Sequence, residues 1–161
     1  MLAAIIGTAC GGGGDQQTSG STDTAAPPAV AAGNGAQLYQ ERCVSCHQAN
    51  GEGLAGSFPP LAGSEFATAA NVEVPIRVVL HGVSGPLMVK GQKFDGLMPQ
   101  FGLGIDMSNE EVAAVLTYVR SSWGNTASAI TPEDVAAVKS KPRTASGSMT
   151  EEELQALMKV P

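Results

Sequence analysis

The chain has 161 residues, a net charge of −6, 4% aromatic residues and 20 glycines. One domain with tails fits this length. The negative charge argues against a nucleic-acid-binding role, which needs a basic face, whereas protein docking stays open because it depends on local patches of charge.

The N-terminus suggests export. Residues 1–9 form an apolar run that is too short to cross a bilayer and lacks the basic residues of a complete signal peptide, so we interpret it as a signal-peptide remnant. Small residues before Cys10 and glycines after it resemble a bacterial lipoprotein processing site, although Gly7 stands where such sites usually carry Leu. We expect a lipid on Cys10, with plain secretion and an unmodified thiol as the alternatives.

Residues 10–33 predict a flexible tether. They are rich in Gly, Ser, Thr, Ala, Pro and Gln and contain almost no large apolar side chain, so they bury too little surface to fold. A tether of this kind holds a domain roughly 25–30 Å from its anchor. We place the folded domain at residues 34–125 and a C-terminal extension with short helices at residues 126–161.

Residues 43–47, with Cys43, Cys46 and His47, carry the strongest chemical signal. Two thiols at this spacing add to the vinyl groups of a haem, and a histidine directly after them ligates the iron. A redox dithiol would need a preceding strand in a βαβ unit, and a zinc site would need four ligands. Because only Cys10 and His81 remain as further ligands of these types, we predict one covalently attached haem c. Its apolar surface supplements a core that is poor in aromatic residues.

The chain resembles a class I mono-haem cytochrome c in five segments that keep the family's order between about residues 34 and 124. They are the first helix with Gly35 and Tyr39, the attachment motif at 43–47, and the segments 59–63, 97–101 and 115–120. The resemblance implies an all-α cytochrome c fold around one haem, with a possible short β-hairpin insert and a C-terminal helical extension. It also implies that Pro59, or alternatively Pro60, accepts a hydrogen bond from the second ring nitrogen of His47, and that Leu61 covers the haem.

The helices are predicted from local patterns. Residues 36–43 should form one helix, and Gly35 suits a close crossing with the closing helix, where Tyr118 would meet Tyr39. Residues 74–82 predict a short helix that ends at Gly82. Alternating residues over 86–96 predict a small hairpin with its turn near Gly91 and Gln92.

The second axial ligand has four candidates, which are His81, Met88, Met98 and Met107. Met98 has the best context, because Pro99 stiffens its loop and Phe101 can pack against the ring edge. A methionine is often only core filler, and Met107 is the nearest substitute. Imidazole with thioether raises the haem potential relative to two imidazoles.

The closing helix and the extension have clear start signals. Ser108 and Glu111 form a capping box, while Trp123 either packs at the haem periphery or pairs with a propionate. Thr131 and Thr150 begin two short helices of the extension. We expect the extension to pack along the haem domain or onto a partner subunit.

The predicted function is single-electron transfer in a bacterial respiratory chain, by an outer-sphere route through the exposed edge of a His/Met-ligated haem. The expected partners are a membrane respiratory complex or a terminal oxidase on the periplasmic side of the cell membrane, with the lipid on Cys10 as anchor. Arg77, Lys90 and Lys93 either rim the haem edge and steer an acidic partner or are simply solvated.

Two alternatives keep the haem. The first is a fixed cytochrome subunit of a membrane quinol-oxidising complex, an oxidase or a dehydrogenase. The second is a haem sensor or enzyme with an open sixth position.

Overall fold

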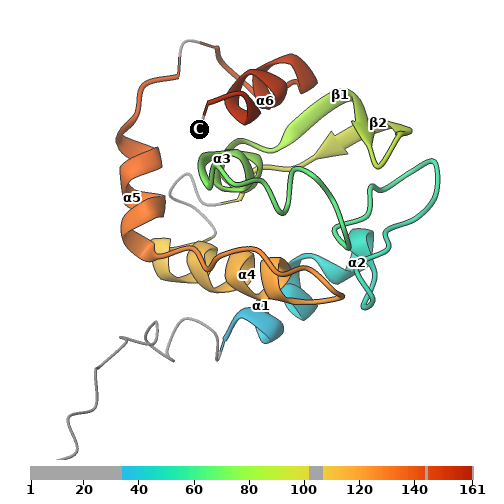
Figure 1. Cartoon of the computed structure of the whole chain (residues 1–161), viewed down its shortest axis with the longest axis horizontal. Coiled ribbons are helices and arrows are strands. Elements are labelled where there is room, and N and C mark those ends of the chain that lie inside the picture. The colour runs from blue at the N-terminus through green and yellow to red at the C-terminus, as the bar shows by residue number, and fades with distance from the viewer. Residues whose placement is uncertain (1–33, 102–106, 144, 161) are drawn as a thin grey trace, which may run out of the picture.

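The computed structural model describes residues 34–101, 107–143 and 145–160. Within these ranges the elements, labelled in Figure 1, are α1 (Gly35–Arg42), α2 (Val44–His47), α3 (Glu73–His81), β1 (Val83–Val89), β2 (Gln92–Met98), α4 (Asn109–Ser121), α5 (Pro132–Ser140) and α6 (Glu151–Met158). None of the helices found here has the length and apolar character needed to cross a membrane. Cys10 and the predicted tether lie outside the described residues, so they stay predictions.

The first and fourth helices cross at close range, as the sequence predicts. Figure 1 shows α1 against α4, and a Cβ atom added to Gly35 would lie 2.2 Å from the carbonyl oxygen of Ala114. The ring of buried Tyr39 packs against Tyr118, with centroids 5.5 Å apart. The absence of a side chain at Gly35 therefore sets how closely the two backbones approach.

The first helix ends where the predicted attachment motif begins. We expected one helix over 36–43, and α1 agrees with this to within one residue at each end; a separate turn of helix, α2, follows. Cys43 stands between them and donates its backbone N–H to the carbonyl of Tyr39. His47, at the end of α2, is buried.

The fold is not purely all-α, which corrects our broader expectation. A hairpin follows α3 directly, and its strands pair from Val83 with Met98 to Val89 with Gln92, several residues beyond the predicted range of 86–96. Its turn holds Lys90 and Gly91, both with positive φ, the backbone that a two-residue hairpin turn needs. The predicted turn, near Gly91 and Gln92, is therefore one residue too late, because a Lys-Gly pair is a weak turn signal and Gln92 already pairs with Val89.

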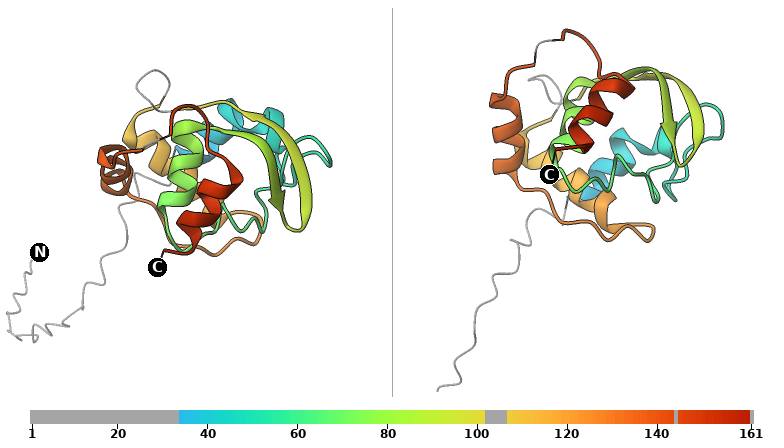
Figure 2. Two further views of the ribbon diagram at one scale, coloured as in Figure 1. Left: turned by 90° about the horizontal axis from the view of Figure 1, so that it is seen from above. Right: turned by 45° about the horizontal axis from the view of Figure 1, so that its top comes forward.

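The C-terminal extension packs on the domain. Helix α5 begins at Pro132 behind Thr131, packs against α4, and is followed by a segment that leads to α6 beside α3 and β1 (Figure 2). Met149 joins the start of β1 in a parallel bridge with Val83 and donates its N–H to the carbonyl of Gly82. Of the two placements that we expected, the structure therefore shows packing along the domain itself.

Candidate haem site

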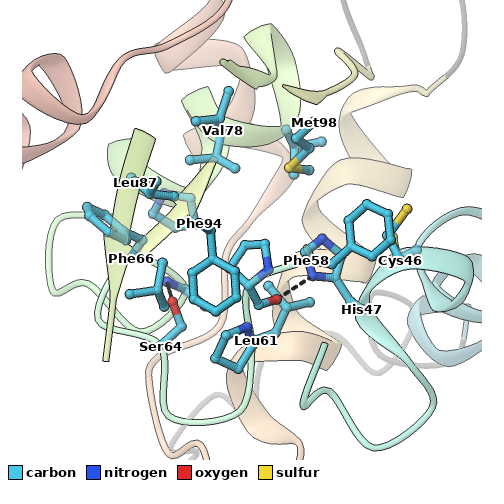
Figure 3. Close-up of a pocket in the computed structure, with 18 of the residues that line it drawn as sticks. Cys46, His47, Phe58, Leu61, Ser64, Phe66, Val78, Leu87, Phe94 and Met98 are labelled. Atoms are coloured by element: carbon cyan, nitrogen blue, oxygen red, sulfur yellow. Dashed lines mark hydrogen bonds between the residues drawn. The ribbon is translucent and has the colours of Figure 1, made fainter. Parts of the chain in front are cut away.

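An apolar pocket lies between the helices, the loop after α2 and the hairpin (Figure 3). Each surrounding element contributes to its wall, and representative lining residues are Cys43, Cys46, His47, Phe58, Leu61, Phe66, Val79, Leu87, Phe94, Met98, Phe101, Leu116 and Leu154. Most of these side chains are aliphatic or aromatic. Such a lining excludes water and suits a large flat apolar group.

His47 is positioned by a hydrogen bond to the loop that faces it. Its Nδ1 lies 2.9 Å from the carbonyl oxygen of Pro59, so the predicted bond is present and Pro59 rather than Pro60 makes it. A carbonyl only accepts, so Nδ1 carries the proton and Nε2 keeps the lone pair that a metal needs. Burial lowers the pKa of His47 below its ordinary value, although the bond to Pro59 opposes this, and the ring is neutral at pH 7.

The loop after His47 is braced from α4 and the residues that follow it. The indole N–H of Trp123 donates to the carbonyl of Ala49, so it is engaged with this turn rather than with a propionate. The amide of buried Asn125 donates to the carbonyl of Leu61 and accepts from the backbone N–H of Gly63. Sequence reasoning missed Asn125, because an asparagine after a helix gives no signal of the distant loop that it holds.

Cys43 and Cys46 both line the pocket beside His47 and are free thiols. Burial and the neighbouring Cys46 raise the pKa of Cys43 to about 11, although the positive charge of Arg42 opposes this shift. A thiol of this kind is a poor nucleophile for disulfide exchange, which needs the thiolate. In the described part of the chain no three His, Cys, Asp or Glu side chains gather into a metal site, so these thiols have no partners for zinc there.

Met98 projects into the pocket from the side opposite His47 (Figure 3). It is the last residue of β2, and Phe101, three residues later, donates its N–H to the carbonyl of Val79 on α3.

The other candidates for the second ligand lie elsewhere: Met107 is buried in the helical core, and Met88 is 39% exposed on the hairpin. His81, at the end of α3, is not among the pocket residues.

Most of the other predicted binding residues also line the pocket, and so do several that sequence reasoning missed. Pro59, Leu61 and Phe101 surround it as expected. Phe66, Phe94 and Leu154 line it too, and Leu154 is fully buried although it comes from the extension. No local motif marks these three residues, because their role depends on packing between distant segments.

The predicted basic rim is corrected in one position. Arg77 is buried and pairs with Glu73 at 2.6 Å, so it is a structural ion pair and not part of a docking surface. Lys90 reaches back to the carbonyl of Ala62, while Lys93 is exposed. Glu73 and Arg77 are four residues apart on a helix, and this spacing in the sequence already favours an ion pair between them.

The residues of this pocket fit a covalently held haem. Two thiols, a buried neutral imidazole with a free Nε2, and a thioether on the opposite side converge on one apolar space. These are the side chains that attach and ligate a haem c.

Comparison with known proteins gives the same picture. The family model described as cytochrome c matches residues 32–123. Cytochrome c-552 of Thermus thermophilus is 41% identical over 100 residues, which cover 60% of this chain and 65% of the relative. The chain therefore aligns with less than two thirds of that protein.

Other relatives are cytochrome subunits of dehydrogenases. The cytochrome c subunit of a quinone-dependent alcohol dehydrogenase from Gluconacetobacter polyoxogenes is 31% identical, over 66% of this chain and 23% of the relative. The fructose dehydrogenase cytochrome subunit of Gluconobacter japonicus is 32% identical, over 66% of this chain and 22% of the relative.

Proposed function

Because the chain belongs to the cytochrome c family, we propose that it passes single electrons between redox proteins through one haem held by Cys43, Cys46, His47 and Met98. Family membership makes the chain an electron carrier with covalently bound haem c. The assignment of these four residues is supported by one observation above all: His47 and Met98 enter an apolar pocket from opposite sides, next to the two thiols.

Each residue has a distinct task in this proposal. Cys43 and Cys46 form the thioether bonds, and the Pro59 carbonyl keeps the His47 ring in the tautomer that leaves Nε2 for the iron. Met98, which lines the same pocket, would supply the second protein ligand to the iron. When bound, the haem supplies an iron that changes between the ferrous and ferric states. With His47 and Met98 as the two protein ligands, the surrounding apolar residues would keep water and substrates away from the metal.

We place the protein on the periplasmic side of a bacterial cell membrane, tethered through a lipid on Cys10, where it serves a respiratory chain. The small and glycine-rich residues around Cys10 support the lipid, and the tether composition supports mobility between partners. The mass of the processed N-terminal peptide from cells labelled with a fatty acid tests this placement. A peptide that begins before Cys10 or carries no lipid contradicts it.

A second candidate function is that of a fixed cytochrome subunit in a dehydrogenase or another membrane complex. The relatives named as dehydrogenase cytochrome subunits favour it. Purification after mild detergent extraction separates the two: a mobile carrier is recovered as a monomer, whereas a fixed subunit elutes with stoichiometric partners.

Maturation in a host that attaches haem c tests the site itself. We expect an intact mass that exceeds the polypeptide by one haem, a pyridine haemochrome spectrum of a haem with both vinyl groups saturated, and no carbon monoxide binding by the reduced protein at neutral pH. A colourless product overturns the haem assignment. Carbon monoxide binding to the wild type instead indicates a sensor or an enzyme with an open sixth position.

A further inference from the structure

Arg120 is a buried cation whose hydrogen-bond partners are all uncharged. It lies near the end of α4 and is 1% exposed. Its guanidinium donates four hydrogen bonds, which go to the carbonyl oxygens of Ala67, Ala69 and Ser128 and to the Ser128 hydroxyl, at distances of 2.9, 3.0, 2.7 and 3.2 Å. All of these acceptors are neutral.

No carboxylate balances this charge in the described part of the chain. The other buried arginine, Arg77, pairs with Glu73, and Arg143 pairs with Glu153, whereas Arg120 takes part in no ion pair there. Burial is the one cause that lowers the pKa of Arg120, and a guanidinium stays protonated in proteins even so. The interior around α4 therefore holds one full positive charge that only carbonyl dipoles and a hydroxyl solvate.

This charge lies directly behind the wall of the haem pocket. Val119, the preceding residue, and Leu116, one turn earlier, both line the pocket. Ala67, whose carbonyl binds the guanidinium, lines it as well. Between the cation and the pocket there is thus packed protein and no bulk water, a setting in which Coulomb interactions are screened far less than at the surface.

We propose that Arg120 tunes the haem, raising its reduction potential by disfavouring the more positive ferric state. Net charge and burial near a haem are among the properties by which a protein sets this potential. The proposal rests on the haem-carrying function proposed above and adds to it a residue that touches neither the iron ligands nor the attachment motif.

The test is the midpoint potential of the matured protein, measured by spectroelectrochemistry at low and high salt. We expect Arg120→Gln to lower the potential at both salt concentrations and Arg120→Lys, which keeps the charge, to stay near the wild type. Lys159→Gln removes the same formal charge from an exposed position and should change the potential less, with the difference fading at high salt.

A second pair of variants decides the matter if Arg120→Gln does not fold. Ser128 is exposed, so Ser128→Asp sets a carboxylate against the guanidinium without removing Arg120, and Ser128→Asn is the uncharged match. We expect the Asp variant to have the lower potential of the two. An unchanged potential in Arg120→Gln, or equal potentials in the Ser128 pair, overturns the tuning role while leaving electron transfer intact. A protein without any reversible haem couple overturns both.

Discussion

At the scale of single residues, the proposed haem ligation depends most on Met98. It ends β2, lines the pocket and packs against both apolar cores of the molecule, which keeps its side chain aimed at the pocket. Met107 occupies the helical core instead, where a methionine acts as a filler. The two methionines therefore have the same side chain, but only Met98 lines the pocket.

Replacing Met98 with Ala should open the sixth coordination position. We expect the reduced Met98→Ala protein to bind carbon monoxide at neutral pH, with a lower midpoint potential, because the soft sulfur ligand is lost. Difference spectra after addition of carbon monoxide provide the measurement. Met107→Ala is the matched control, and its reduced form should still not bind carbon monoxide. The reverse pattern would reassign the ligand.

Glu73 is a buried carboxylate that ties two distant elements together. It is 8% exposed and pairs with Arg77 on its own helix and with Lys141, the residue that follows α5. Burial raises the pKa of Glu73, but the hydrogen bonds from Lys141 and Arg77 outweigh it, so the pKa lies below its ordinary value. The carboxylate form therefore stabilises the folded state.

This sign predicts how stability depends on pH. Since the pKa of Glu73 is depressed by folding, its contribution is complete above the ordinary glutamate pKa of about 4.3 and is lost as the pH falls through the folded-state value. Glu73→Gln should lower the free energy of unfolding at pH 7 by about 1–3 kcal/mol. Denaturant titrations of the haem-loaded protein from pH 7 to pH 3.5 should show the gap closing. Glu152→Gln, at an exposed position, is the control; a gap that stays constant with pH argues against the ion pairs.

At the scale of elements, the crossing of α1 and α4 carries the attachment motif. Gly35 lets the helices approach, and the aromatic rings of Tyr39, Tyr118 and Trp123 then pack on one another at centroid distances between 4.9 and 5.6 Å. Tyr39 also donates its hydroxyl to the carbonyl of Gln48, next to His47. A hydrogen bond thus joins the helix crossing to the residue next to His47, the proposed iron ligand.

A single methyl group at the crossing should be costly. In Gly35→Ala the new carbon would meet the Ala114 carbonyl oxygen at 2.2 Å, and backbone cannot yield as a side chain does. We expect a loss of about 1–3 kcal/mol in unfolding free energy, the usual cost of overpacking. Thermal and denaturant unfolding of the loaded protein measure it. Gln40→Ala on the exposed face of α1 should be near neutral, and equal stabilities of the two variants would refute the tight crossing.

At the scale of the whole molecule, two apolar cores meet at the haem pocket. One joins α1, α3, α4 and α5, and the other joins the hairpin to α6 through Met149 and Leu154. Figure 2 shows α6 lying beside α3 and the hairpin. Arg143 and Glu153 add an ion pair that holds the segment leading into α6. The extension is therefore part of the fold and completes the pocket.

Leu154 gives a direct test of this role. It is fully buried and lines the pocket, so Leu154→Ala should lower the unfolding free energy by about 2–5 kcal/mol through lost burial and the cavity left behind. Leu54→Ala makes the same change at a side chain that is 52% exposed and should cost less than about 0.5 kcal/mol. Unfolding of both loaded proteins under identical conditions provides the comparison. If the two losses are equal, α6 is only an attachment to the surface.

Residues close together in the sequence could be interpreted without the structure. The thiols and the imidazole of residues 43–47 are adjacent, so their spacing alone indicates haem attachment. The capping boxes that begin α4, α5 and α6 at Ser108, Thr131 and Thr150 involve residues only three apart, and each is present in the structure. Local hydrogen bonding determines such features, whatever the rest of the chain does.

Contacts between distant segments were decided only by the tertiary structure. The hydrogen-bond partner of His47 is Pro59 and not Pro60. Leu154 lies in the pocket wall, and buried Arg120 donates to the carbonyl of Ala67. The tertiary structure also directed Arg77 inward to Glu73. No pattern along the chain specifies these contacts, because each depends on how complete helices, loops and the hairpin pack around the apolar pocket and on which buried polar groups then lie within hydrogen-bonding distance.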